Sequence, residues 1–148
     1  MIDLEKTQRR IDRFPALCRR AGLKVTPQRS AVYAMLASTD THPSPETIFS
    51  SVREGLPNIS QGTVYKVLDL LTERGLLVKV ATPGQVARYD ARTEPHYHAV
   101  CIRCGGIEDV QAEAAPPVPR VDSDGGFDVH KVDVVLQGLC HNCRAPDA

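Results

Sequence analysis

Apolar residues recur at helical spacing through the first half of the chain. A first helix is predicted over residues 3–21. Thr26 precedes Pro27 at the start of a second helical segment, and Ser44 precedes Pro45 at the start of a third. A Ser or Thr cap followed by proline is typical of a helix N-terminus, because the hydroxyl accepts a backbone N–H and proline fits the first turn. We therefore expect three helices in this region.

A fourth helix is predicted over residues 61–74, with Ser60 as its cap and Gly75 at its end. Its apolar positions at i, i+3, i+4 and i+7 form one stripe, which consists of Val64, Val67, Leu68 and Leu71. Two short strands follow at residues 76–80 and 85–89, around a turn that contains Pro and Gly. Helices followed by a β-hairpin predict a winged helix-turn-helix.

The second half has the pattern of short strands. They are predicted over residues 98–102, 107–110 and 129–136, whereas the Pro- and Ala-rich residues 112–126 show no clear period. Together the two halves predict an α+β protein. Its expected parts are a winged-helix DNA-binding domain (1–89), a hinge (90–95) and a small metal-binding domain (96–148).

Charge is distributed unevenly between the two halves. Residues 1–80 carry 12 Lys and Arg against 8 Asp and Glu, residues 81–148 carry 6 against 10, and the net charge is zero. A basic half that binds a polyanion and an acidic half that binds cations would give this distribution, as would an ordinary solvated surface. Residues 1–13 are charged throughout, and no apolar run is long enough to span a bilayer. We expect a cytoplasmic protein without a signal peptide or membrane segment.

Four of the five cysteines form two C-x-x-C pairs that are separated by 35 residues. The pairs are Cys101 with Cys104 and Cys140 with Cys143. Each pair places two thiolates on one turn, and two such turns supply the four sulfur ligands that structural zinc prefers. Disulfides or buried thiols are the alternative, but nothing else in the sequence indicates an oxidising compartment. We therefore expect zinc to join the two ends of the second domain.

Polar residues of the second and fourth helices are candidates for DNA contacts. Tyr65 and Lys66 face away from the apolar stripe, where a phenol and an amine can reach base edges and phosphates in a major groove. Ser60 and Thr63 at the start of the same helix, and Arg29 in the second helix, are expected to contact phosphates. Winged helices also contact proteins, and an ordinary solvated face would carry the same residue types.

A second group of candidate ligands surrounds the first cysteine pair. His96 and His98 are two residues apart on a predicted strand, so both imidazoles point to one face. Asp90 lies upstream, Asp109 lies downstream, and His42 precedes the third helix. Nitrogen and carboxylate ligands suit Fe(II) or Mn(II) better than a thiolate-seeking ion. An ion that also bound His42 would bridge the domains and control their relative angle; the alternative is a set of ordinary surface residues.

Longer motifs resemble those of the ferric uptake regulator (Fur) family from about residue 15 onward. They are LKVTPQR (23–29), HPSPETI (42–48), ISQGTVYKVL (59–68), HYHAVCIRCG (96–105) and GLCHNC (138–143). The resemblance implies a homodimeric metal-responsive repressor of a palindromic DNA operator, in which an α/β dimerisation domain follows the winged helix. It also implies structural zinc on the four paired cysteines, and a regulatory ion on His42, Asp90, His96, His98 and Asp109.

The carboxylates favour the peroxide-sensing, PerR-type branch of that family. Iron-uptake regulators generally have Glu at the positions of Asp90 and Asp109, whereas the peroxide sensors have Asp at both. In that branch Fe(II) reacts with hydrogen peroxide and a ligand histidine becomes 2-oxo-histidine; the resemblance points to His42 and His96. Bound Mn(II) would give a repressor that reacts poorly with peroxide. The expected targets are oxidative-stress and metal-homeostasis genes, and an iron-uptake regulator or a zinc or manganese sensor is the alternative.

The chain departs from the family pattern in three places. Pro95, Tyr97 and Val132 replace the ligands of a further metal site, which we expect to be absent. Lys66 stands where Arg is usual, so the charge is kept but bidentate contact with guanine is lost. Residues 116–119, Pro-Pro-Val-Pro, fall where the family has a helix, and a shortened helix or an irregular loop is expected.

Two other classes of function fit parts of the pattern. Two histidines and a carboxylate can serve a non-haem iron enzyme, because such a site leaves positions open for oxygen. A zinc-stapled module for protein interaction is the second class. We expect no enzyme and no small-molecule substrate apart from peroxide as a signal, since any oxidation would be of the protein's own ligand.

Overall fold

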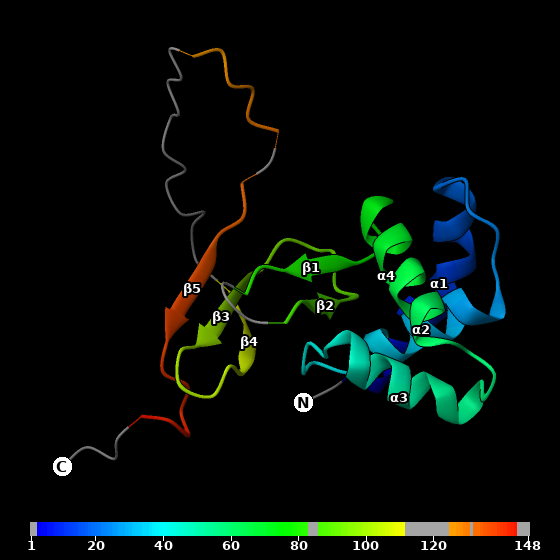
Figure 1. Cartoon of the computed structure of the whole chain (residues 1–148), viewed down its shortest axis with the longest axis horizontal. Helices are drawn as coiled ribbons and strands as arrows, with labels where there is room; N and C mark the ends of the chain where they lie inside the picture. Colours follow the sequence, from blue (N-terminus) through cyan, green and yellow to red (C-terminus); the bar gives the residue numbers. More distant parts are fainter. Residues whose placement is uncertain (1–2, 83–85, 112–124, 131, 145–148) are drawn as a thin grey trace. The chain divides into compact units, whose positions relative to one another are not determined.

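The structure is a computed structural model that describes residues 3–82, 86–111, 125–130 and 132–144 (Figure 1). The chain divides into two compact units, Met1–Pro95 and His96–Ala148. Four helices and a two-stranded sheet lie in the first unit, and a three-stranded sheet lies in the second. The predicted α+β class is therefore confirmed. None of the helices within the described ranges is long and apolar enough to cross a membrane.

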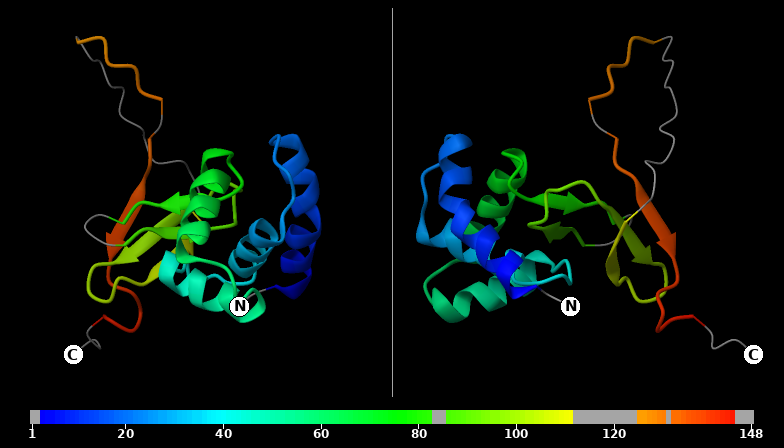
Figure 2. Two further views of the ribbon diagram at one scale, coloured as in Figure 1. Left: turned by 45° about the vertical axis from the view of Figure 1, so that its right-hand side comes forward. Right: turned by 180° about the vertical axis from the view of Figure 1, so that it is seen from behind.

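The four helices of the first unit begin where the sequence predicts. They are α1 (Leu4–Arg20), α2 (Pro27–Ala37), α3 (Pro45–Gly55) and α4 (Gln61–Glu73). A polar side chain precedes each helix and accepts a backbone N–H from its first turn, and the four caps are Asp3, Thr26, Ser44 and Ser60. Pro15 lies inside α1 and does not end it. Figure 2 shows the four helices packed against one another from two further sides.

The core of the first unit forms where apolar faces of all four helices meet. Leu36 of α2, Ile48 of α3 and Leu68 of α4 have almost no exposed surface. The predicted stripe of α4 is confirmed, since Val64, Val67, Leu68 and Leu71 are all buried. The ring of Phe14 in α1 stacks on that of Tyr33 in α2, with 4.3 Å between their centroids. This packing buries one face of α4 and leaves the opposite face in solvent.

The hairpin of the first unit consists of β1 (Val78–Val80) and β2 (Arg88–Asp90), which pair antiparallel. Both strands are shorter than predicted, and Asp90, which the sequence placed in the hinge, is the last residue of β2. The reason is the register, since Asp90 pairs with Val78 and thereby extends the ladder by one residue. Residues 90–95 belong to the first unit. Pro83 and Gly84 of the predicted turn lie outside the described residues.

The sheet of the second unit has the strand order β4-β3-β5. Its strands are β3 (Tyr97–Cys101), β4 (Ile107–Val110) and β5 (Val135–Gly138). β3 pairs antiparallel with β4 and parallel with β5. The predicted strand over 129–136 is wrong at its start, because β3 is short and offers partners only to residues 135–138. Residues 112–124, which include the proline-rich segment, lie outside the described residues.

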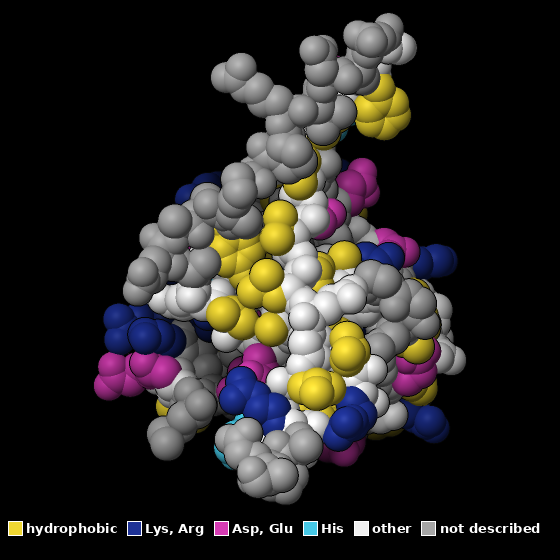
Figure 3. Space-filling model, turned by 90° about the vertical axis from the view of Figure 1, so that its left-hand side faces the viewer, with side chains coloured by type: hydrophobic (Ala, Val, Ile, Leu, Met, Phe, Trp, Pro, Cys, Tyr) yellow, Lys and Arg dark blue, Asp and Glu magenta, His cyan; other side chains and the backbone are white. Residues whose placement is uncertain are grey.

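Hydrophobic side chains stay exposed on the second unit. Those with large apolar surfaces in solvent are Ile102, Phe127, Val129, Val132, Leu136 and Leu139. The face of the molecule in Figure 3 shows hydrophobic side chains gathered over the region of β5. Within the described residues of this unit no helix covers the sheet, and exposed apolar side chains that lie together mark an interaction surface.

Candidate metal centres and DNA-binding helix

The pairing of β3 with β5 brings the two cysteine turns to one end of the sheet. Cys101 is the last residue of β3, and its register partner is Gly138, the last residue of β5. Because the two strands run parallel, the turn that follows each strand emerges on the same side. Gly105 completes the first turn at φ +71°, a conformation that glycine adopts without strain. The four cysteine sulfurs all lie within 4.8 Å of one another.

The spacing of the sulfurs fits a tetrahedral zinc ion. Cys104 Sγ and Cys140 Sγ are 3.8 Å apart, and Zn–S bonds of about 2.3 Å would place sulfurs about 3.8 Å apart. The backbone N–H of Cys140 bonds to Cys101 Sγ across the two turns. Arg103, in the first turn, donates through Nη1 to the backbone oxygen of Cys143 in the second, at 2.6 Å. These contacts hold the two turns in register.

The thiols of this cluster differ in acidity. The backbone N–H of Cys140 stabilises the thiolate of Cys101 and lowers its pKa to about 6. Cys143 behaves in the opposite way. A hydrogen bond with the side chain of Cys140, together with burial, raises the pKa of Cys143 to about 12. Four thiolates packed together repel one another, so the protons leave in steps that belong to the group. Because zinc binds thiolates, zinc binding must displace the remaining protons.

His42 and Asp90 meet inside the first unit. The Nε2 atom of His42 lies 3.3 Å from Oδ2 of Asp90, and both side chains are almost fully buried. The second oxygen of Asp90, Oδ1, accepts the backbone N–H of Arg92 at 2.7 Å. One carboxylate oxygen is thus fixed by the backbone, and the other faces the imidazole.

The backbone of His42 is held in an unusual conformation. Its φ of +50° is the only positive value of a non-glycine residue in the described part of the chain. Arg88 of β2 donates through Nη1 to the backbone oxygen of His42 at 3.3 Å. A side chain in the left-handed region costs energy and persists only where its surroundings hold it. Arg88 is therefore a positioning residue for His42, and the sequence signal for it is its i, i+2 spacing from Asp90 on one strand.

His96, His98 and Asp109 meet on the sheet of the second unit. His98 of β3 is the register partner of Asp109 of β4, and His96 comes directly before β3. The Nε2 atoms of the two histidines are 2.9 Å apart. Asp109 Oδ1 lies 3.4 Å from Nε2 of His96 and 3.6 Å from Nε2 of His98. Neighbouring ligands on an octahedral ion with bonds of about 2.1 Å are about 3 Å apart, so these three donors fit such an ion.

The candidate DNA contacts lie on the solvent side of α4. Tyr65 and Lys66 are exposed, as predicted for that face. The hydroxyl groups of Ser60 and Thr63 lie 2.8 Å apart at the start of the helix. Arg29, at the start of α2, donates to the backbone oxygen of Lys24. Sequence reasoning missed the partner of Tyr65, which is Glu46 of α3, because no spacing rule links residues on different helices.

Comparisons with known proteins cover both units. A profile of the Ferric uptake regulator family matches residues 20–137. The chain is 30% identical over 144 residues to the peroxide-responsive repressor PerR of Staphylococcus aureus, and the match covers 97% of each chain.

Solved structures give the same result. One is a zinc uptake regulator complexed with zinc and DNA, which matches with a TM-score of 0.70 and 25% identity over 93% of this chain and 94% of that one. Another is the peroxide stress regulator of Campylobacter jejuni, with a TM-score of 0.62 and 29% identity over 84% of this chain and 92% of that one. The profile match, the long curated match and the shared fold agree. The chain belongs to the ferric uptake regulator family of metal-responsive transcription regulators.

Proposed function

We propose that this protein is a metal-dependent DNA-binding repressor that senses hydrogen peroxide. The observation that carries the proposal is the cluster of His96, His98 and Asp109, whose Nε2 and Oδ1 atoms lie within 3.6 Å of one another. Two imidazoles and a carboxylate at this spacing suit Fe(II) or Mn(II). The repressor controls oxidative-stress and metal-homeostasis genes.

A structural zinc ion is proposed for the four cysteines. Their mutual spacing supports it, because all four sulfurs lie close enough to share one tetrahedral ion. Among the described residues of the second unit, the buried apolar side chains include Val100, Cys101 and Ile107. Zinc binding energy would add to the stability that these side chains give.

The regulatory ion is proposed to take its ligands from both units. His42 and Asp90 come from the first unit, and His96, His98 and Asp109 come from the second. The support is that each unit already gathers its own ligands into one group. An ion that binds both groups restricts the movement of one unit against the other. Metal then favours the arrangement in which α4 fits its DNA site.

The peroxide response rests on two observations. The chain is 30% identical to a peroxide-responsive repressor over nearly its whole length, and both carboxylates of the set are aspartates. Bound Fe(II) would catalyse a net two-electron oxidation, in which hydrogen peroxide gives one oxygen atom to the imidazole carbon and its other oxygen leaves as water. The imidazole of His42 or His96 becomes 2-oxo-histidine, which weakens its metal binding and releases the operator. Mn(II) reacts poorly with peroxide, so the Mn(II) form stays on DNA.

The DNA-bound form is proposed to be a homodimer on a palindromic operator. Tyr65 and Lys66 of α4 contact base edges, while Ser60, Thr63 and Arg29 contact phosphates. The exposed apolar side chains of the second unit support a dimer, because a second copy would cover them. Two copies then present two α4 helices to two half-sites.

Neighbouring carboxylates on β4 offer a matched test of the metal site. Both are exposed, but Asp109 Oδ1 lies 3.4 Å from Nε2 of His96, whereas Glu108 precedes it on the strand and points to the opposite face. An operator would first be selected from a random DNA pool with the Mn(II)-loaded protein. Asp109→Ala is expected to weaken Mn(II)-dependent operator binding at least about tenfold, and Glu108→Ala to leave it unchanged. If the parent chain and both variants bind DNA equally well with and without Mn(II), the proposal is contradicted.

A further inference from the structure

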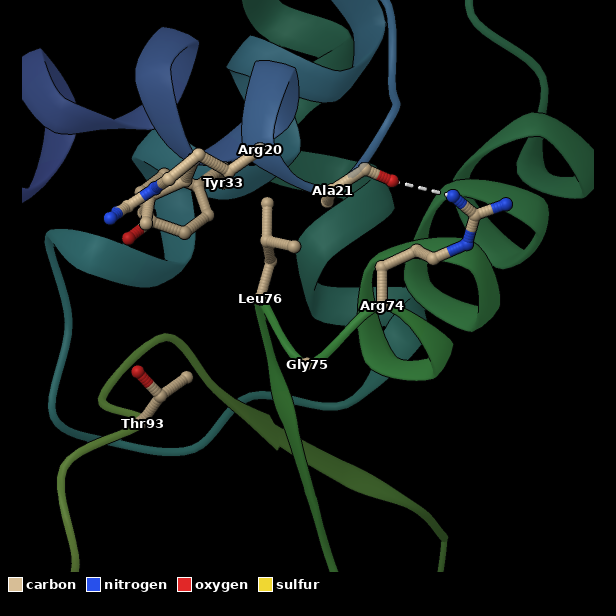
Figure 4. A pocket seen from close by; sticks show the side chains of 8 residues that line it. Arg20, Ala21, Tyr33, Arg74, Gly75, Leu76 and Thr93 are labelled. Carbon is tan, nitrogen blue, oxygen red and sulfur yellow. Dashed lines mark hydrogen bonds between the residues drawn. The ribbon is translucent and has the colours of Figure 1, made fainter.

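A pocket in the first unit shares no lining residue with the metal-ligand groups or with the candidate DNA contacts. It has a volume of about 270 Å³, and Figure 4 shows it from close by. Residues of α1 and α2, the end of α4 and the segment after β2 line it: Leu17, Arg20, Ala21, Tyr33, Arg74, Gly75, Leu76 and Thr93. Pockets for drug-sized ligands begin at about 300 Å³, so this one suits a smaller molecule.

The hydroxyl of Tyr33 distinguishes this pocket from a surface hollow. Tyr33 is 97% buried, since only 3% of its surface is exposed. Among the described residues, none forms a hydrogen bond with its hydroxyl. The hydroxyl is not among the fully enclosed polar atoms that lack a partner. It therefore reaches solvent and is available to a ligand, as the polar end of a mostly buried tyrosine often is. The hydroxyls of Tyr33 and Thr93 lie on the same side of the pocket in Figure 4, and Tyr33 extends in the same direction as Arg20.

The charges around that hydroxyl are mainly positive. Burial raises the pKa of Tyr33, so the phenol keeps its proton, while Arg10 and Arg13 act in the opposite direction because they lie nearby. Arg20 and Arg74 line the pocket. The guanidinium of Arg74 is engaged with the backbone oxygen of Ala21 at 2.6 Å. Glu94 is the carboxylate of this group, and it pairs with Arg10 at 3.6 Å.

We propose that this pocket binds a small organic carboxylate with a compact apolar body. The Tyr33 hydroxyl donates to the carboxylate, and Arg20 supplies the charge that balances it. The side chains of Leu17 and Leu76 contact the apolar body. Arginine rather than lysine fits this role, because a planar guanidinium matches a carboxylate. The binding does not depend on the proposed metal response.

The ligand would connect parts of the chain that are far apart in sequence. Thr93 belongs to the last residues of the first unit, whereas Arg20 ends α1. A bound carboxylate also competes with Glu94 for the positive charges near Tyr33. The carboxylate would therefore be a second regulatory ligand besides the metal. It would bind beside Thr93, in the last residues of the first unit.

Benzoate is the probe for this site, with benzamide as its neutral match and inorganic phosphate as an anion without an apolar body. Binding to the full zinc-loaded chain would be measured by calorimetry and by shifts of tyrosine carbon signals in NMR spectra. We expect one benzoate per chain with a Kd of about 1 mM or lower, no binding of benzamide, and weaker binding of phosphate.

Two variants and one control locate the binding. Tyr33→Phe keeps the ring that stacks on Phe14 but removes the hydroxyl, and Arg20→Gln removes the charge. Each is expected to weaken benzoate binding at least about fivefold. Arg53→Gln, which alters an arginine that lies over Phe49 on α3, should leave it unchanged. If Tyr33→Phe fails to fold, Arg20→Gln alone tests the proposal, because Arg20 is exposed and its substitution should not disturb folding. No benzoate binding, equal binding of benzamide, or equal losses in Arg20→Gln and Arg53→Gln would overturn the proposal.

Discussion

The phenol of Tyr65 on α4 donates a 2.7 Å hydrogen bond to Oε1 of Glu46 on α3. The same bond is the main cause that lowers the pKa of Glu46, so this carboxylate is ionised at neutral pH. Tyr65 is among the residues proposed to contact bases. Its ring is thus held by a neighbouring helix before DNA arrives, and the loss of side-chain entropy on binding is reduced.

Glu46→Ala is therefore expected to weaken operator binding by about fivefold relative to a variant that loses only the charge, because Tyr65 loses the bond that holds it. Removing a negative charge should by itself strengthen DNA binding, so the two effects oppose each other. Glu54→Ala, an exposed carboxylate at the other end of α3, isolates the charge effect. Fluorescence anisotropy with a labelled operator measures both. If the two variants tighten binding equally, Glu46 does not position Tyr65.

Arg88 provides a second test of positioning, at the metal site. It holds the backbone oxygen of His42, whose φ is +50°. Arg88→Gln should let this loop relax and lower the affinity for Mn(II) by about tenfold, as removal of an outer partner of a ligand does. Lys79→Gln removes one positive charge from the partner strand β1 and should leave the affinity unchanged. If both variants lose the same affinity for Mn(II), Arg88 acts only through its positive charge.

Removal of zinc should unfold the second unit and spare the first. The main hydrophobic cluster of the described chain, which runs from Phe14 to Ala91, lies entirely in the first unit. The second unit depends more on the metal, because its described residues contribute nothing to that cluster. Hydrogen exchange with and without a chelator measures this, and Cys104→Ser should give the same pattern. Loss of protection in α2 and α4 on chelation would contradict the assignment.

Acid should release the zinc in a defined range of pH. The pKa of Cys101, about 6, is below that of an ordinary thiol, so the stabilised thiolate persists at neutral pH and is lost as the pH falls through that value. Zinc competes with protons for the thiolates, which moves its release to still lower pH. A chromogenic chelator should therefore detect a midpoint below about 6. Zinc release from the reduced protein at neutral pH would contradict this expectation.

Features set by neighbouring residues in the sequence were easier to predict than contacts between residues that are far apart in the sequence. The caps Thr26, Ser44 and Ser60 mark helix starts, because the capping hydroxyl bonds within one turn. The start of β5 was wrong, since a strand's length depends on the partner that pairs with it. The bonds from Tyr65 to Glu46 and from Arg103 to Cys143 were missed for the same reason. Candidate metal ligands were easier to propose from the sequence, because ligand chemistry restricts the residue types.

Peroxide sensing is the central claim, and one measurement tests it directly. The zinc-loaded protein would be filled with Fe(II) without air, treated with one equivalent of hydrogen peroxide, and examined by peptide mass spectrometry together with operator binding. Mn(II)-loaded protein is the control. We predict that His42 or His96 gains one oxygen atom and that the Fe(II) form leaves the operator, while the Mn(II) form stays bound. Retained operator binding with both histidines unmodified would contradict the account and favour an iron-responsive repressor.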